Sequence, residues 1–297
     1  MEIASRDIPS SSQGFVDIGH TQVGYKKIGT GPDLLFIHGW PLNGGTWRNV
    51  TPYLDGFTRW VIDLPGTGTS TATTDTPLTV QGHVESVVKV LDGLGLSKVA
   101  IVGHDSGGMI GRYVAEKRPE VVQALSLCGT EIPGHHPFVV AVLSAAGRLP
   151  GAKAMFRFTM GNKLLARGPL ALGGAFSDTS LVNGEFRTAL LDPILADDSA
   201  MDAIITMIAK FSKHDAEPLA QTHPNLTMPV LLVWGEDDPF FPVEKARSMV
   251  DQFGGPTEFV TLPNCKLLVH EEYPERFAQL TRDFLFSSGF ATSPKTG

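Results

Sequence analysis

The residue that could do the most direct chemistry is Asp105, in the stretch Val99-Ala-Ile-Val-Gly-His-Asp-Ser-Gly-Gly-Met-Ile-Gly-Arg112. The apolar residues that open this stretch are typical of a buried parallel strand, and Ser106–Arg118 is predicted to be a helix. Gly103 and Gly107 suit a sharp reversal in which a Cβ atom has no room. Such a turn would hold the Asp105 carboxylate outward, where it could attack an electrophilic carbon and form an ester.

Two other interpretations of this stretch stay open. Shifting the spacing by one residue would make Ser106 the nucleophile of a carboxylic-ester hydrolase, but His104 would then stand where the turn needs a small residue. The stretch could also be a glycine-rich turn with only a structural role. The surrounding sequence has to decide between these interpretations and an Asp nucleophile.

The composition limits both the fold and the kinds of partner. With 297 residues, 42% of them hydrophobic, the chain can bury a large core as one elaborated α/β domain or as two small domains. The net charge of -7 disfavours nucleic acid and an anionic membrane, since both reward basic patches. We therefore expect a small-molecule substrate, mostly neutral, with a homodimer as an open alternative to a monomer.

The sequence also indicates a compartment. The two cysteines, Cys128 and Cys265, argue against a disulfide scaffold and favour a reducing environment. The stretch Met1–Pro9 lacks the apolar core of a signal peptide, and no segment approaches the roughly 18 apolar residues of a membrane span. We expect a cytoplasmic protein that uses neither a metal nor a cofactor.

The element pattern predicts how the chemistry is positioned. Residues 15–28 read as a hairpin, and apolar segments near residues 34, 60, 100 and 125 then alternate with helical patterns near residues 47, 85 and 110. This alternation predicts a parallel sheet with helices on both faces. Because sites in such sheets lie at the carboxyl ends of strands, we expect His38–Trp40, Asp63 and Asp105 to share one mouth.

The pattern changes after residue 130. No strong strand pattern occurs from Glu131 to about Thr222, where helical runs are broken by proline and glycine, as in an inserted lid. The α/β pattern resumes with strands at 230–234 and 257–262 and helices at 243–250 and 271–284. We therefore predict a core built from residues 1–130 and 223–297, with a helical cap formed by residues 131–222.

With these elements in place, the chain resembles the α/β-hydrolase superfamily, and within it the branch with an Asp nucleophile: epoxide hydrolases, haloalkane dehalogenases and fluoroacetate dehalogenases. The resemblance covers nearly the whole chain. It implies a mostly parallel eight-stranded sheet with helices on both faces and an inserted cap. Four motifs carry it: His38-Gly-Trp-Pro41, Asp63-Leu-Pro-Gly-Thr-Gly68, Gly103-His-Asp-Ser-Gly107 and Trp234-Gly-Glu-Asp-Asp-Pro239.

The resemblance also implies roles for named residues. Asp105 would be the nucleophile, and the backbone amides of Trp40 and Ser106 would form an oxyanion hole when water attacks the ester carbonyl. Asp238, favoured over its neighbour Asp237 by the Gly-x-x-Asp spacing, would be the acid that orients a histidine. Trp40 and His104 would also contact the substrate.

The histidine itself departs from the family pattern. The family carries a Gly-His pair after the last strand, but Lys266 and Leu267 stand at those positions, and His270 lies three residues further on. Three hypotheses follow: His270 serves as the base, the base is missing, or another histidine replaces it. Without a base, Asp105 could still be alkylated, but hydrolysis of its ester would stall.

The groups that would activate the leaving atom are also unusual. Epoxide hydrolases of this branch are expected to use two lid tyrosines, yet no tyrosine lies between Glu131 and Thr222. Dehalogenases often use a tryptophan directly after the nucleophile, and here that residue is Ser106. The Trp40 indole could supply an N–H donor instead.

Four other polar residues are expected to lie on the surface. His83 is predicted to be solvated on its helix. Glu131 sits near the alternative acid position that the resemblance implies for some dehalogenases, but by count from the nucleophile that position is Gly129, so Glu131 is predicted to lie at the surface where the lid begins. His135 and His136 are predicted to be solvated in the loop that opens the lid.

The favoured function is opening of a small or medium apolar epoxide through a covalent ester on Asp105, followed by attack of water. The acid placed after the seventh main strand and the aromatic residue in the His-Gly-Trp-Pro motif favour this substrate over a haloalkane. The alternatives are a haloalkane dehalogenase, a carboxylic-ester hydrolase, and a catalytically impaired or ligand-binding member, which the substitution at Leu267 would explain.

Overall fold

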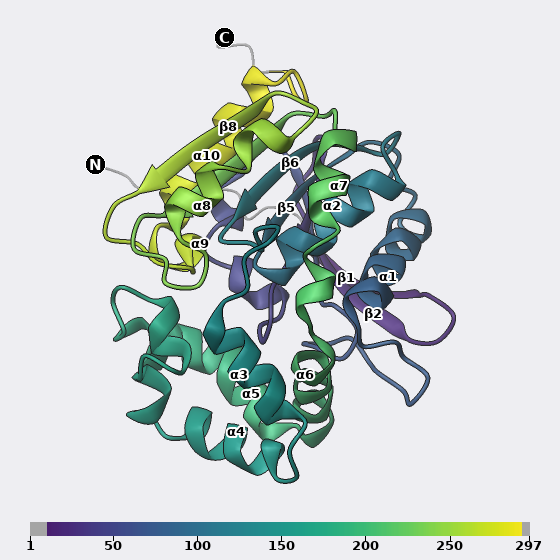
Figure 1. Cartoon of the computed structure of the whole chain (residues 1–297). Coiled ribbons are helices and arrows are strands. Elements are labelled where there is room, and N and C mark those ends of the chain that lie inside the picture. Colours follow the sequence, from purple (N-terminus) through teal and green to yellow (C-terminus); the bar gives the residue numbers. More distant parts are fainter. Residues whose placement is uncertain (1–10, 293–297) are drawn as a thin grey trace, which may run out of the picture.

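A computed structural model describes residues 11–292, so the stretch Met1–Pro9 and its signal-peptide expectation lie outside the described residues. One eight-stranded sheet crosses the molecule in the order β1-β2-β4-β3-β5-β6-β7-β8 (Figure 1). The strands are β1 Ser11–Asp17, β2 Gln22–Ile28, β3 Asp33–Ile37, β4 Thr58–Ile62, β5 Val99–His104, β6 Val122–Cys128, β7 Val230–Gly235 and β8 Thr257–Leu262.

The direction of the strands follows the prediction. The hairpin β1–β2 is antiparallel, and β2 also pairs antiparallel with β4. All other neighbours, from the β3–β4 pair through to β7–β8, are parallel. The mostly parallel eight-stranded sheet is therefore confirmed. Its carboxyl edge, where β3, β5, β6 and β7 end side by side, is where the site has to form.

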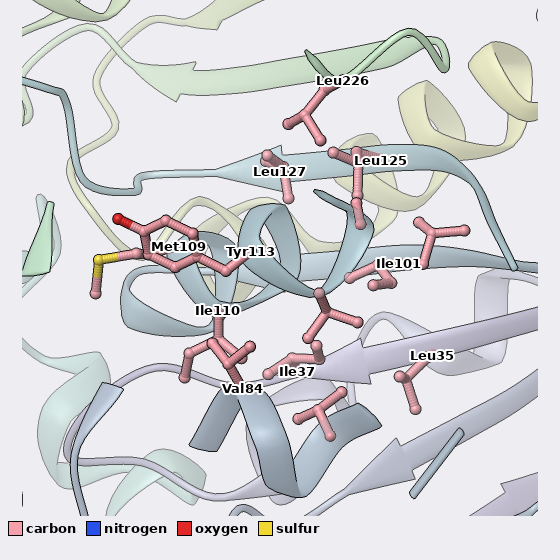
Figure 2. Packing of buried hydrophobic residues seen from close by; sticks show 14 of the residues in the cluster. Leu35, Ile37, Val84, Ile101, Met109, Ile110, Tyr113, Leu125, Leu127 and Leu226 are labelled. Carbon is pink, nitrogen blue, oxygen red and sulfur yellow. The ribbon is translucent and has the colours of Figure 1, made fainter. Parts of the chain in front are cut away.

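The apolar side chains of the central strands alternate between two cores, as the period of a strand requires. Leu35 and Ile37 of β3 belong to one cluster, while Leu34 and Phe36 belong to the cluster on the opposite face. Figure 2 shows the first cluster, in which residues of the helix after β5 pack onto the sheet. The core helices are α1 Val80–Gly93, α2 Ser106–Lys117, α7 Leu219–Thr222, α8 Val243–Arg247, α9 Val269–Glu272 and α10 Pro274–Ser287.

Two expected helices are interrupted, each near a proline. The helix expected near residue 47 is two short 3-10 turns, Gly44–Trp47 and Thr51–Tyr53, with Pro52 in the second turn. The helix expected from residue 271 is divided into α9 and α10 at Pro274. Proline lacks a backbone N–H and its ring clashes with the preceding helical turn, so a continuous helix is disfavoured at both places.

The segment between β6 and β7 contains helices and turns, with no strand, as expected of a lid. Its longer helices gather at one end of the molecule (Figure 1). The Trp40 indole N–H fastens this layer to the core by donating to the main-chain oxygen of Ile204 at 2.9 Å. The division at residues 131 and 222 stays a prediction. The lid α-helices are α3 Phe138–Gly147, α4 Ala152–Gly161, α5 Asp192–Ala196 and α6 Asp198–Lys210.

The length and apolar character of the helices decide whether one of them could cross a membrane. None of those in residues 11–292 combines the length and the apolar character that crossing a membrane requires.

The close approach of α2 to β3 generates the first testable prediction. A Cβ atom on Gly107 would lie 2.3 Å from the main-chain oxygen of Ile37 and 2.4 Å from that of His38. We expect Gly107→Ala to lower the free energy of unfolding by about 1 to 3 kcal/mol, because rigid backbone would have to move. Urea denaturation measures this change.

The control is Gly161→Ala at the end of α4, where an added Cβ would meet no atom within 4 Å. Its free energy of unfolding should stay within about 0.5 kcal/mol of the wild-type value. Equal stability of the two variants would contradict the packing described for Gly107.

Candidate active site

Asp105 occupies the turn between β5 and α2 with φ 51° and ψ −134°, a backbone conformation that L-residues rarely adopt. The neighbouring main chain fixes this turn. The Asp105 amide donates to the oxygen of Gly129 at 2.9 Å, and Thr130 Oγ1 donates to the Asp105 oxygen at 2.8 Å. The predicted strand–turn–helix reversal is therefore present, and side chains beyond glycine at residue 107 would obstruct it.

Backbone amides face the Asp105 carboxylate. The Trp40 amide donates to Asp105 Oδ2 at 3.0 Å and also lies 3.1 Å from Ser106 Oγ. Gly39 allows this approach, since a Cβ there would lie 2.4 Å from the Cβ of Asp105. An amide that already binds one carboxylate oxygen is placed to bind the oxyanion that would form at the same atom.

Burial and the neighbouring backbone amides have opposite effects on the pKa of Asp105. Burial raises the pKa of Asp105 to about 6, with the Asp238 carboxylate adding to the rise and the amides of Ser106 and Trp40 opposing it. At neutral pH the group is still mostly ionised, which a nucleophile requires.

Asp105 opens into a cavity of about 80 Å³ between the core and the lid. Apolar side chains from both parts surround it, which suits a small apolar ligand. Polar groups reach it from the loops after β3 and β5 and from the start of the lid. The lining residues are His38, Gly39, Trp40, Pro41, Leu42, Leu64, Thr67, Leu78, Thr79, Val80, His83, Asp105, Ser106, Ile110, Glu131, His135, His136, Pro137, Val140, Met207, Ile208, Phe211 and Phe241.

Asp238 lies just beyond the end of β7 and is 5% exposed, whereas Asp237 is exposed. Its Oδ1 accepts hydrogen bonds from the amides of Phe240 at 2.8 Å and Phe241 at 3.0 Å. Its Oδ2 is buried without a hydrogen-bond partner in the described part of the chain. Burial raises the pKa of Asp238 to about 7, although the two amides act in the opposite direction. One carboxylate oxygen is thus free for a donor that the surrounding residues do not supply.

The position of the family histidine is filled by an apolar residue. Leu267 is partly buried and packs against both the core and the lid clusters. Its loop lies against the loop that carries Asp238, because the Asp237 amide donates to the oxygen of Cys265 at 2.9 Å. A leucine side chain neither bonds to Asp238 nor takes a proton from water.

His270 does not replace that histidine, and the expectation that it acts as the base is corrected here. Its side chain is completely buried, and its ring lies 4.5 Å from the ring of Trp47, outside the cavity. Thr46 Oγ1 gives its proton to Glu271 Oε1 at 2.7 Å, so His270 Nε2 is the donor in the 2.7 Å bond to Thr46. This ring is therefore a structural part of the core face opposite α2.

Two further expectations about polar residues at the mouth are also corrected. His104 is fully buried with its ring 4.4 Å from that of His270, so it does not line the cavity or reach a substrate there. Asp63 is used to hold loops, since its Oδ1 accepts from the Gly44 amide at 2.7 Å and its Oδ2 from the Thr69 amide at 2.7 Å. Neither residue faces Asp105 across the cavity.

The Trp40 side chain lines the cavity, but its N–H is not free for a substrate. As described above, it donates to Ile204 of α6. The expectation that this indole could activate a leaving oxygen or halide is therefore corrected, because one N–H cannot serve both partners.

Two of the histidines that line the cavity are held by hydrogen bonds and do not substitute for the missing base. His38 is engaged on both nitrogens, with Nδ1 3.0 Å from the oxygen of Gly39 and Nε2 3.0 Å from the Leu64 amide. His135 is also engaged, with Nε2 2.8 Å from the oxygen of Phe240 and Nδ1 2.9 Å from Lys245 Nζ. Neither ring is free to take a proton from water.

The prediction that the His83 side chain is exposed to solvent is wrong. The residue is 5% exposed rather than solvated, and neither ring nitrogen has a partner within residues 11–292. Burial lowers the pKa of His83 to about 3, so the neutral ring is a weak base. The signal was present, since residue 83 stands at helical spacing from the buried Val80 and Val87.

Glu131 was also misplaced by sequence. It is 6% exposed, lines the cavity, and its Oε2 lies 3.0 Å from Thr130 Oγ1. The signal was its position just after β6, because the rule that placed Asp105 at a strand end applies equally to Glu131. No group of three or more His, Cys, Asp or Glu side chains within residues 11–292 is arranged to hold a metal ion.

Comparison with known proteins supports this picture of the fold. A family model described as the alpha/beta hydrolase fold matches residues 32–282. A 2-hydroxy-6-oxo-6-(2'-aminophenyl)hexa-2,4-dienoic acid hydrolase from Metapseudomonas resinovorans is 26% identical over 298 aligned residues, covering 96% of this chain and 94% of that protein. Epoxide hydrolase 3 from Xenopus tropicalis is 24% identical over 306, covering 92% and 77%.

Among solved structures, the epoxide hydrolase CorEH without ligand superposes with a TM-score of 0.79. It is 23% identical, and the match covers 94% of this chain and 99% of that chain. At this identity the likeness establishes a shared fold. Both comparisons span the lid as well as the sheet.

The unpartnered oxygen of Asp238 generates the second prediction. A carboxyl group whose pKa rises from 3.8 when unfolded to about 7 when folded binds more protons in the native state, so it costs stability as pH rises through that interval. The Asp238 carboxyl group therefore contributes a fall in the free energy of unfolding between pH 5 and pH 8, whereas buried histidines with lowered pKa values, such as His83 and His104, contribute a rise in the lower part of that range. Asp238→Asn, which carries no charge, should become more stable relative to the wild type at pH 8 than at pH 5 when denaturation midpoints are compared at the two pH values.

Asp237→Asn is the matched control, because Asp237 is the exposed neighbour. Its pH dependence should equal that of the wild type. A wild-type slope in Asp238→Asn would mean that the Asp238 carboxyl group does not carry this cost.

Proposed function

The chain belongs to the α/β-hydrolase family, and from that premise we propose that it opens small apolar epoxides through a covalent ester on Asp105. The observation that carries the proposal is the Asp105 carboxylate at a strained turn, with its Oδ2 bound by the Trp40 amide, at the wall of an apolar cavity. A carboxylate whose one oxygen is held by an amide presents the other oxygen for attack on carbon.

The chemistry has two steps. In the first, Asp105 Oδ1 attacks an epoxide carbon, the carbon–oxygen bond of the ring breaks, and the ring oxygen takes up a proton. The product is a hydroxyalkyl ester of Asp105. In the second, water attacks the ester carbonyl and gives one proton to a base. The oxyanion then collapses, the ester carbon–oxygen bond breaks, and the remaining proton of the added hydroxyl passes to the departing oxygen, which releases the diol and the Asp105 carboxylate.

Three observations support this choice within the family. The cavity is lined mainly by apolar side chains, and nothing there provides a positive partner for an acidic substrate close to Asp105. Asp238 lies after β7, where the resemblance to epoxide hydrolases expects the acid. The Xenopus relative, which matches most of this chain, is named an epoxide hydrolase.

The residues that donate and accept protons in the family mechanism are replaced in this chain. No tyrosine is among the residues that line the cavity, and Leu267 stands where the family has its histidine. Ring opening without a donor and ester hydrolysis without a base would both be slow. A functioning hydrolase therefore needs another cavity group to handle the proton.

The third prediction tests the nucleophile. Incubation of the wild type with 1,2-epoxybutane should give the diol and, on intact-mass measurement, a transient increase equal to one epoxide. Asp105→Asn should lose both, with diol formation falling by about 1,000-fold or more, because the amide is a poor nucleophile.

Ser106→Ala is the matched control, since Ser106 is the adjacent residue and the nucleophile of the alternative interpretation. It should still form the adduct on Asp105. If Ser106→Ala abolishes hydrolysis of small esters while Asp105→Asn retains it, the protein is a serine esterase and the proposal is wrong.

A further inference from the structure

We propose that Glu131 carries the proton in both steps, giving it to the leaving oxygen when Asp105 attacks and taking one from water when the ester is hydrolysed. The inference rests on the proposed function, since it assigns a role in the reaction of Asp105. It would explain how one chain can lack both the lid tyrosines and the histidine after the last strand.

The geometry places Glu131 beside the reacting group. Glu131 and Asp105 line the same cavity, and Thr130 joins them. Thr130 Oγ1 lies 2.8 Å from the main-chain oxygen of Asp105 and 3.0 Å from Glu131 Oε2. Arg112 fixes this threonine by donating to the same Oγ1 at 2.8 Å. The Glu131 carboxyl group is bonded to Thr130 through Oε2 and also interacts with the backbone amide of Glu131 itself, which holds it at the wall of the cavity.

The charges around Glu131 favour its protonated form at neutral pH. Burial, together with the negative charge of Asp105, raises the pKa of Glu131 to about 8, against the opposing effects of Arg112, the Glu131 backbone amide and the bond to Thr130. The Tyr113 phenol also interacts with this carboxyl group. At pH 7 the pair therefore holds one proton, on Glu131, with Asp105 ionised, which is the distribution that ring opening needs.

Ester formation then reverses the role of Glu131. Asp105 Oδ1 bonds to carbon, the ring carbon–oxygen bond breaks, and the Glu131 proton moves to the ring oxygen, leaving a neutral ester and a Glu131 carboxylate. That carboxylate takes a proton from water as the water oxygen bonds to the ester carbonyl. This step restores protonated Glu131. As the oxyanion collapses, the ester carbon–oxygen bond breaks and the remaining proton of the added hydroxyl passes to the departing oxygen, which releases the diol and ionised Asp105, so no proton is gained or lost overall.

The neighbouring groups leave this task to Glu131. His38 and His135 are hydrogen-bonded on both nitrogens, and burial keeps the pKa of His83 at about 3. His136 is exposed at the entrance of the cavity. Besides Asp105, Glu131 is the only carboxylic acid among the described residues that line the cavity, and it is buried.

The fourth prediction concerns Glu131→Gln, which keeps the shape of protonated Glu131 and so should fold. With 1,2-epoxybutane, alkylation of Asp105 should slow by about 100-fold, because no proton reaches the ring oxygen. With 1-bromobutane, whose bromide leaves without a proton, alkylation should proceed at the wild-type rate. In the wild type, alkylation removes the negative charge of Asp105 that raises the pKa of Glu131, so Glu131 releases its proton to solvent and then acts as the base. Hydrolysis of the butyl ester should therefore be about 100-fold slower in Glu131→Gln than in the wild type, and the alkylated variant should accumulate on intact-mass measurement.

The pH profile gives a second measurement. Wild-type ring opening should rise as pH increases through about 6, where Asp105 ionises, and fall through about 8, where Glu131 loses its proton. Glu131→Gln should lose the upper limb and keep the lower one. Glu120→Gln, an exposed glutamate, is the control and should retain the wild-type rates and both limbs.

The outcomes separate this role from the proposed function. If wild type forms the ester and Glu131→Gln hydrolyses it equally fast, the role of Glu131 is overturned and the ester stands. If wild type forms no adduct and no product with either substrate, the ester itself is overturned, and the role of Glu131 with it. If the butyl ester accumulates in Glu131→Gln and not in the wild type, the result supports both the ester on Asp105 and the role of Glu131.

Discussion

The structure depends on one strained residue, Asp105, held at positive φ between β5 and α2. This conformation costs free energy, and it persists because the surrounding backbone leaves no alternative. The oxygens of Ile37 and His38 stand where a side chain on residue 107 would be, and the oxygen of Gly129 holds the Asp105 amide. The ends of β3, β5 and β6 therefore meet around a single carboxylate, and the cavity forms above it.

That arrangement has an electrostatic consequence. Asp105, Glu131 and Asp238 are all buried, and burial raises the pKa of each. Arg112, a buried cation that acts on Glu131, is directed to main-chain and hydroxyl oxygens and to His223, so it offsets the charge of Glu131 only in part. A fold that buries three acids loses stability at neutral pH, and buried acids with raised pKa values are typical of a reactive site.

The sequence was most informative where backbone geometry decides the outcome. The glycines on either side of Asp105 and the apolar runs of the strands predicted the turn, the sheet and the lid, since sterics and burial act locally. It was least informative about side-chain direction. His270 is three residues from the family histidine, yet the short α9 turns its ring toward Trp47, and His83 faces inward because of a helical period that its polarity obscured.

The loop after β8, where the family has its catalytic histidine, forms hydrogen bonds that connect the core to the lid in this chain. The Lys266 amide donates to Glu272 Oε2 at 3.1 Å, and Glu272 Oε1 accepts from the lid amides of Ser177 at 2.8 Å and Asp178 at 3.0 Å. The Leu268 amide bonds to the oxygen of Ala175 at 3.2 Å. A loop that elsewhere in the family carries a base here fastens the lid, and Leu267 extends the apolar contact between lid and core. Hydrolysis requires a proton acceptor near the ester, and the acceptor need not be a histidine. A buried carboxyl group at the end of β6, such as Glu131, can therefore serve in place of a histidine on this loop.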